Sequence, residues 1–155
     1  MTEDGLYNRA LSMLAVRGYA TDDLRRRLTR KGFAAGDIAG VLERLTAVGL
    51  LDDAAYARQL TRSKVLGGGA ASGRVRRELA SRGVKRDIAE RAIAAVMDDE
   101  AVDETALAEQ VARRRMAALA RFDHATQRRR LYAYLARRGY RADDIRRAVE
   151  LAMSD

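Results

Sequence analysis

The apolar residues of this 155-residue chain recur mainly at intervals of three and four positions, which places them on one face of an α-helix. No comparable stretch has the alternation expected of strands. The pattern therefore predicts an all-α protein. The predicted helices cover residues 6–17, 22–31, 35–48, 52–66, 73–82, 86–97, 103–120, 125–138 and 142–153. Their expected core residues include Leu24, Leu28, Ile38, Leu45, Val65, Val75, Leu79, Ile93, Val96, Val111, Leu119, Leu131, Leu135, Ile145, Val149 and either Leu151 or Ala152.

A basic residue, a glycine and a large apolar residue recur together between the predicted helices. The four copies are Arg17-Gly18-Tyr19, Lys31-Gly32-Phe33, Arg82-Gly83-Val84 and Arg138-Gly139-Tyr140. Such a glycine can adopt the left-handed conformation that ends a helix, while the apolar residue folds back onto the last turn. An aspartate follows each copy within a few residues, where the positive end of the next helix favours it. Thr21, Asp52 and Ser72 are the expected N-caps of the helices that they precede.

The glycine motif and the apolar positions before it place three segments in one frame. Leu24, Val75 and Leu131 are equivalent, and so are Leu28, Leu79 and Leu135. The sequence thus predicts a tandem array of three three-helix repeats at residues 1–50, 51–100 and 101–155. Because one such unit buries little surface alone, we expect the repeats to pack on their neighbours in an elongated, curved array. Gly67-Gly68-Gly69-Ala70-Ala71 is the only clearly flexible segment predicted.

The composition favours a protein of a reducing, aqueous compartment. The chain has no cysteine and no proline, so disulfides and cysteine-ligated zinc are excluded. The polar N-terminus does not resemble a signal peptide, and no apolar run has the length of a membrane span. We expect a cytoplasmic protein with no membrane contact.

Residues that could carry catalysis are scarce. His124 is the only histidine, and it follows Asp123 in a predicted turn. The acidic pairs Asp22-Asp23, Asp52-Asp53 and Asp143-Asp144 lie where helices begin, so capping explains them. Gly68-x4-Gly73 lacks the lysine and the preceding strand of a phosphate-binding loop. The sequence predicts no enzymatic activity, no cofactor and no metal.

Charge is the most informative bulk property. Thirty Lys and Arg against 22 Asp and Glu give a net charge of +8, and nearly all the positive charge is arginine. An excess of this kind favours a polyanion or an acidic protein surface as partner. Equivalent helices of the three repeats are basic, which would produce a line of arginines along the array. The alternative is that these residues only solvate the outer faces of amphipathic helices. The candidate partner- or nucleic-acid-binding residues are Arg25, Arg27, Arg30, Lys31, Arg74, Arg76, Arg77, Arg82, Arg128, Arg130, Arg137 and Arg138.

Two stretches of the middle repeat carry a resemblance to a known family. GLLDDAAYAR at residues 49–58 and GRVRRELASRGV at residues 73–84 resemble the RecX regulatory proteins. The resemblance extends over about residues 10–153. It implies a protein that binds the RecA recombinase filament on single-stranded DNA and inhibits strand exchange and ATP hydrolysis. We expect a non-enzymatic monomer that binds single-stranded DNA within the filament, or weakly alone. The resemblance also implies that the basic middle-repeat helix with Arg74, Arg76, Arg77 and Arg82 faces the filament.

Two other functions remain open from the residues alone. Short helices joined by glycine turns are compatible with a helix-turn-helix-like regulator that binds DNA directly. A helical scaffold for another partner is the third interpretation. Salt dependence separates the first two, because a protein held by phosphates binds naked DNA with a steep salt slope.

Overall fold

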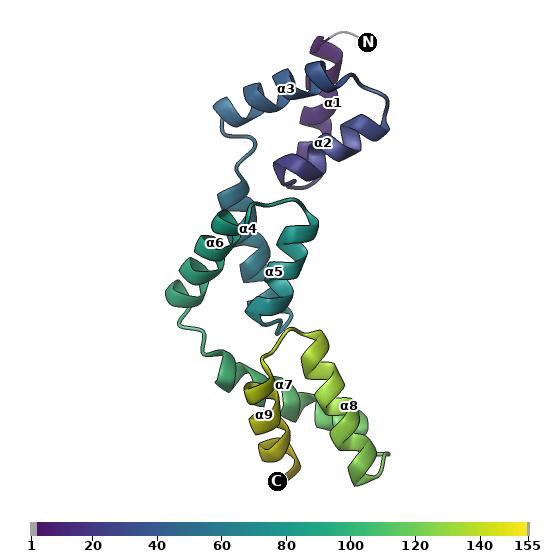
Figure 1. Ribbon diagram of the computed structural model, residues 1–155, viewed down its shortest axis with the longest axis vertical. Helices are drawn as coiled ribbons and strands as arrows, with labels where there is room; N and C mark the ends of the chain where they lie inside the picture. The colour runs from purple at the N-terminus through teal and green to yellow at the C-terminus, as the bar shows by residue number, and fades with distance from the viewer. Residues whose placement is uncertain (1–2, 155) are drawn as a thin grey trace. The chain divides into compact units, whose positions relative to one another are not determined.

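The computed structural model describes residues 3–154, and helices account for most of them (Figure 1). No strand occurs in this range. The helices are α1 Glu3–Val16, α2 Thr21–Arg30, α3 Ala35–Ala47, α4 Asp53–Arg62, α5 Ser72–Ser81, α6 Arg86–Asp99, α7 Glu104–Leu119, α8 His124–Arg137 and α9 Ala142–Ser154. A π-helical turn, Ser63–Gly67, directly follows α4. The prediction of an all-α chain built from three three-helix repeats is confirmed: α1–α3, α4–α6 and α7–α9.

The described chain divides into two compact units. The first unit comprises residues up to 59 together with 78–92, and the second comprises 60–77 together with the residues from 93 onward. Each unit therefore contains one complete terminal repeat and part of the middle repeat.

Each unit has its own apolar core. In the first unit, α1, α2 and α3 bury Leu6, Ala10, Leu24, Leu28, Ile38, Val41, Leu42, Leu45 and Leu51. In the second unit, α7, α8 and α9 bury Ala71, Ala108, Val111, Ala112, Leu119, Leu131, Leu135, Tyr140, Ile145, Ala148, Val149 and Ala152. Of the two alternatives at the end of the chain, Ala152 is the core residue and Leu151 is 36% exposed. Leu51 and Ala71 come from the middle repeat, so each core also takes one residue from its neighbour.

Three of the four glycine motifs end a helix as predicted. Gly32, Gly83 and Gly139 have φ values of 94°, 77° and 88°. The residue after each glycine donates its backbone N–H to a carbonyl in the last helical turn, as Phe33 does to Leu28. The prediction is wrong for Gly18, which does not have a positive φ. Helix α1 ends earlier, at Val16, and the segment after it runs to the start of α2 without a left-handed residue.

The starts of α2 and α5 are capped by carboxylates from the following repeat. The backbone N–H of Thr21 donates to Asp53 Oδ1 at 2.8 Å, and that of Ser72 donates to Glu104 Oε1 at 2.6 Å. The two pairs have the same sequence separation, 32 residues. Thr21 and Ser72 are therefore not N-caps, as the sequence suggested, but the first helical residues. Asp52 does cap α4, through the backbone N–H of Ala55.

The glycines that end α5 and α8 also form close contacts between successive repeats. A Cβ atom on Gly83 would collide with the side chain of Asp22 in α2, and one on Gly139 would collide with Arg74 in α5. Gly73 faces Gly139 in the second case, and a Cβ on Gly73 would lie 2.6 Å from the carbonyl oxygen of Gly139. We call α2, α5 and α8, the second helices of the three repeats, the middle helices. The end of one middle helix thus packs directly on the start of the preceding middle helix. We call these contacts the first junction, at Gly83, and the second junction, at Gly139.

Alanine substitutions at Gly139 and Gly32 separate backbone strain from junction packing. Both glycines have a positive φ, so an added Cβ strains either backbone by about 1–2 kcal/mol. Only Gly139 has a neighbour in the way, because no atom lies within 4 Å of a Cβ on Gly32. We expect Gly139→Ala to reduce the free energy of unfolding by about 1–3 kcal/mol more than Gly32→Ala does. Urea unfolding measures both, and equal losses would contradict the close packing.

Candidate partner-binding site

The twelve basic residues proposed from the sequence differ in exposure. Arg27, Arg76, Arg82 and Arg138 are half-buried. The exposed members are Arg25, Arg30, Lys31, Arg74, Arg77, Arg128, Arg130 and Arg137. They are distributed over both compact units.

In the first unit, the members of the proposed set without an ion pair lie at the end of α2. None of the ion pairs among residues 3–154 involves Arg30 or Lys31, and both side chains are exposed. Arg25 pairs with Asp22 at 2.8 Å, although its side chain remains 49% exposed. Exposed pairs of this kind contribute little to stability, so Arg25 can exchange Asp22 for another anion.

Arg27 and Arg82 are held by the protein itself. Asp23 is only 5% exposed, and its carboxylate lies 3.1 Å from Arg27 Nε, 3.4 Å from Arg82 Nη1 and 3.8 Å from Arg17 Nη2. Arg82 reaches it across the first junction. The hydrogen bond to Tyr19 and the proximity of Asp23 raise the pKa of Arg17 above its ordinary value. These arginines compensate the buried charge of Asp23, so their main role is to stabilise the fold.

In the second unit, Arg74 and Arg77 project from α5, and Arg128 and Arg137 project from α8. All four are exposed, and no ion pair among the described residues involves them. Arg74 stands where the first repeat has Asp23, so the second junction has no equivalent buried carboxylate. The basic surface of this unit is therefore less compensated by its own chain.

The cluster Arg128–Arg130 occupies a distinctive position in the repeat. Arg128 is equivalent to Ser72, whose backbone a carboxylate of the next repeat caps. Helix α8 begins earlier in this frame, at His124, and Asp123 caps it by accepting from the Thr126 N–H at 3.0 Å. The hydrogen bonds from Thr126 lower the pKa of Asp123. Arg128 and Arg130 consequently stay exposed, with Arg130 over the ring of Phe122 at 4.1 Å.

The glycine-rich segment 67–69 is tied to the third repeat. Arg138 Nη1 donates to the carbonyl oxygen of Gly68, and the Tyr140 hydroxyl donates to that of Gly69 at 2.7 Å. Gly69 has a φ of 65°, and a Cβ there would lie 2.9 Å from Val111. The expectation of a flexible loop is therefore wrong, because these glycines permit a close approach between backbone and neighbouring side chains. Arg138 therefore has a structural role, because its guanidinium donates to the Gly68 carbonyl oxygen in this contact.

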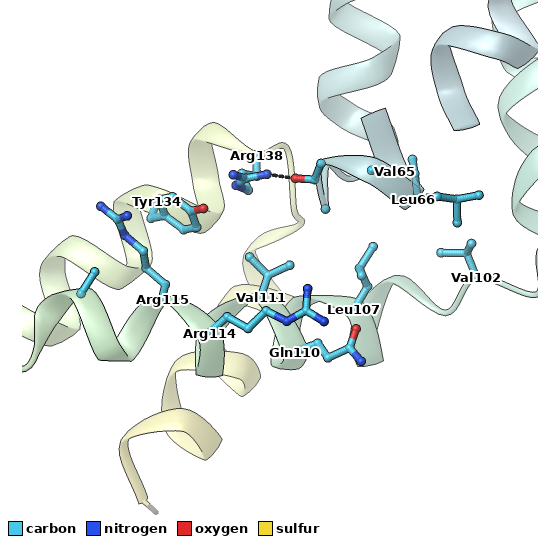
Figure 2. Close-up of a pocket in the computed structure, with 14 residues that line it drawn as sticks. Val65, Leu66, Val102, Leu107, Gln110, Val111, Arg114, Arg115, Tyr134 and Arg138 are labelled. Carbon is cyan, nitrogen blue, oxygen red and sulfur yellow. Dashed lines mark hydrogen bonds between the residues drawn. The ribbon is translucent and has the colours of Figure 1, made fainter. Parts of the chain in front are cut away.

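A groove of about 490 Å³ lies beside this segment (Figure 2). It is bounded by the π-helical turn and the glycines after it, by Val102, by one face of α7, by Tyr134 of α8 and by Arg138 directly after α8. The lining residues are Val65, Leu66, Gly67, Gly68, Gly69, Val102, Leu107, Gln110, Val111, Arg114, Arg115, Ala118, Tyr134 and Arg138. Only Arg138 belongs to the set proposed from the sequence. For Arg114 and Arg115, the signal that the sequence offered was the basic run 113–115.

Three family models match the chain. They are described as the first, second and third RecX three-helix domains, and they match residues 7–45, 52–93 and 103–149 respectively. The chain belongs to the RecX family. The RecX proteins that it resembles are described as regulatory proteins.

Individual RecX relatives are similar over most of their length. The regulatory protein RecX of Pelodictyon phaeoclathratiforme is 31% identical, and the match covers 92% of this chain and 85% of that protein. For RecX of Prosthecochloris aestuarii the identity is 33%, with 92% and 90% covered. For RecX of Halorhodospira halophila it is 36%, with 94% and 87% covered.

Solved RecX structures have the same fold. The crystal structure of RecX from Lactobacillus salivarius superposes with a TM-score of 0.79 at 16% identity, covering 99% of this chain and 97% of that one. A second crystal structure, of regulatory protein RecX, gives a TM-score of 0.81 at 17% identity, covering 99% and 73%. At these identities the comparison supports the fold and not the site.

Within residues 3–154, no group of three or more His, Asp or Glu side chains is placed to hold a metal ion. None of the described helices combines the length and the apolar character needed to cross a bilayer.

The buried Asp23 should contribute far more to stability than its neighbour Asp22. We expect Asp23→Asn to lower the free energy of unfolding by about 3 kcal/mol, because three guanidinium groups lose their shared counter-charge. Asp22→Asn removes only exposed pairs with Arg25 and Arg26, and should cost less than about 1 kcal/mol. Thermal unfolding of the two variants makes the comparison. Similar losses would show that Asp23 is not the anchor of the first junction.

Tyr140 should make the stability of the protein depend on alkaline pH. Burial, and secondarily Glu104, raise its pKa above the ordinary value of 10.0. As pH rises, Tyr140 therefore loses its phenolic proton in the unfolded chain before it does so in the folded protein. The contribution of the neutral phenol to the free energy of unfolding is complete below about pH 10 and declines as pH rises further.

The Tyr140→Phe variant tests this dependence. At neutral pH it should be about 1 kcal/mol less stable than the parent, because the hydrogen bond to Gly69 is lost. Above about pH 10 the difference should shrink, since only the parent has this phenol to ionise. Urea unfolding from about pH 8 to about pH 11 measures it. A difference that stays constant or grows with pH would refute the assignment.

Proposed function

We propose that this RecX-family protein binds the RecA recombinase filament on single-stranded DNA and restrains strand exchange and ATP hydrolysis. The family resemblance implies this activity. The observation that carries it on this chain is the set of exposed basic residues on the middle helices that no ion pair of the described chain neutralises: Arg30, Lys31, Arg74, Arg77, Arg128 and Arg137. Arginine forks of this kind suit the carboxylates and phosphates of a nucleoprotein polymer.

A filament presents the same subunit surface many times. Three repeats with exposed arginines can therefore make several modest contacts at once, and their combined affinity exceeds that of one contact. Bound in this way, the protein would oppose the subunit movements that accompany ATP hydrolysis and strand exchange. The proposal requires no catalytic group on the protein, and it takes the active species to be a cytoplasmic monomer.

The residues with a self-contained structural role should contribute less to this binding. Arg27 and Arg82 compensate Asp23, and Arg138 supports the glycine-rich segment. Arg74 and Arg77, which lie together on α5, are the strongest members of the proposed surface in the second unit. Arg30 and Lys31 are their counterparts in the first unit.

Co-sedimentation with recombinase filaments, compared with single-stranded DNA alone, tests the proposal. We expect tighter binding to the filament, together with slower ATP hydrolysis and strand exchange. Unchanged rates at saturating protein would overturn it. Equal binding to naked DNA with a steep salt dependence would instead favour the direct DNA-binding regulator.

The double variant Arg74→Ala/Arg77→Ala should bind filaments about tenfold more weakly, because it removes two exposed guanidinium groups from one helix face. Its free energy of unfolding should change by less than about 0.5 kcal/mol per site, since neither side chain is buried. The matched control is Arg91→Ala/Arg146→Ala, which removes two exposed arginines that pair with Asp87 and Asp143. If the control weakens binding equally, net charge and not this surface is responsible.

A further inference from the structure

The groove in the second unit has two chemically different ends. Figure 2 shows Leu66, Val102 and Leu107 at one end and Arg115, Tyr134 and Arg138 at the other, with Arg114 between them. None of the fourteen lining residues is acidic. An occupant therefore has to offer apolar surface to one end and negative charge to the other.

The apolar end of the groove leaves hydrophobic side chains exposed to solvent, which is energetically unfavourable. Leu66 is 53% exposed although it lies in the π-helical turn beside buried Val65. Val102 and Leu107 are only partly buried. Covering a leucine-sized side chain here would stabilise a complex by about 1.5–3 kcal/mol. Single-turn π-helical segments are frequent at functional sites. This end suits one large aliphatic or aromatic side chain.

The basic end is already ordered. The guanidinium of Arg115 lies 4.5 Å from the centroid of the Tyr134 ring, and that of Arg138 lies 4.8 Å from it. Arg138 also donates to the Gly68 carbonyl oxygen. Arg114 is exposed, and none of the ion pairs among residues 3–154 includes it. Arg114 and Arg115 can therefore receive a carboxylate without first breaking an internal pair.

The same features argue against a nucleic-acid strand in this groove. Single-stranded DNA is held by bases stacked on aromatic rings. The one aromatic ring here, Tyr134, already lies against two guanidinium groups. The opposite end is aliphatic and has no ring on which a base could stack.

We propose that this groove binds a short segment of a protein partner in which a large apolar side chain is flanked by carboxylates. The apolar side chain packs on Leu66, Val102 and Leu107, and the carboxylates pair with Arg114 and Arg115. A volume of about 490 Å³ accommodates two or three side chains. The groove thus adds a protein-specific contact to the basic surface, which by itself does not distinguish phosphate from carboxylate.

A binding assay with the full chain and fluorescein-labelled peptides tests this without recombinase or DNA. The probe peptide is Glu-Asp-Leu-Leu-Glu-Glu, and the comparison peptide has serine in place of both leucines. A hexamer of deoxythymidine is the nucleic-acid probe. We expect the leucine peptide to bind at least about tenfold more tightly than the other two probes, because only it satisfies both ends of the groove.

Matched variants locate the binding. Leu66→Asp and Arg114→Glu should each weaken the leucine peptide by at least about tenfold. Leu50→Asp and Arg9→Glu are the controls, since Leu50 is 50% exposed against 53% for Leu66 and Arg9 is likewise exposed on α1. Circular dichroism and thermal unfolding confirm that all four variants fold. Should Leu66→Asp fail to fold, Leu66→Ser takes its place, and Arg114→Glu still tests the basic end of the groove.

Three results would overturn the inference: no binding of the leucine peptide at about millimolar concentration, equal binding of the serine peptide or the oligonucleotide, or equal loss in the control variants. The outcome is independent of the filament assays. Filament binding without peptide binding removes the groove and leaves the proposed function intact. Peptide binding without filament binding supports the groove and removes the proposed function.

Discussion

Within each compact unit, the packing of successive repeats depends on the close approach between the end of one middle helix and the start of the preceding one. Gly83 and Gly139 leave no room for a Cβ at these contacts. The carboxylates of Asp53 and Glu104 reach back to cap α2 and α5 within the same two units. Steric fit and charge therefore act at the same place, and each repeat supplies groups that its neighbour needs.

The two junctions are both close contacts at a glycine, but their chemistry differs. In the first, the buried carboxylate of Asp23 gathers Arg17, Arg27 and Arg82. In the second, Arg74 replaces that acid, and backbone groups make the contact: the Ala71 N–H donates to the Arg138 carbonyl oxygen at 2.9 Å. Asp23 neutralises arginines in the first junction, whereas no ion pair among the described residues involves Arg74 in the second. As a result, the uncompensated positive charge is larger in the second unit.

The groove follows from the second junction. Arg138 and Tyr140, which flank the glycine at the end of α8, hold the carbonyl groups of Gly68 and Gly69. This contact fixes the π-helical turn and leaves Leu66 facing outward beside α7. A structural contact between repeats thereby creates a surface that the outer arginines alone could not provide. Its mixed apolar and basic character separates it from the rest of the charged surface.

The sequence by itself determined the helices, the repeat and the family. Apolar spacing and glycine motifs are local signals, because helix formation and helix ends depend on residues within about one turn of each other. The exposed arginines on α5 and α8 were predictable for the same reason. The residues 49–58 and 73–84 sufficed for the family resemblance.

Only the tertiary structure decided which charges are available and where the apolar surface is open. Asp23 appeared to be one of a capping pair, yet it is buried among arginines that are up to 59 residues away in sequence. Gly67–Gly69 suggested flexibility, yet side chains about 70 residues away donate hydrogen bonds to the carbonyl groups of Gly68 and Gly69. Such contacts join groups that are distant in the chain, and no local spacing encodes them. The side chains of one repeat acquire their roles only when the next repeat packs against them.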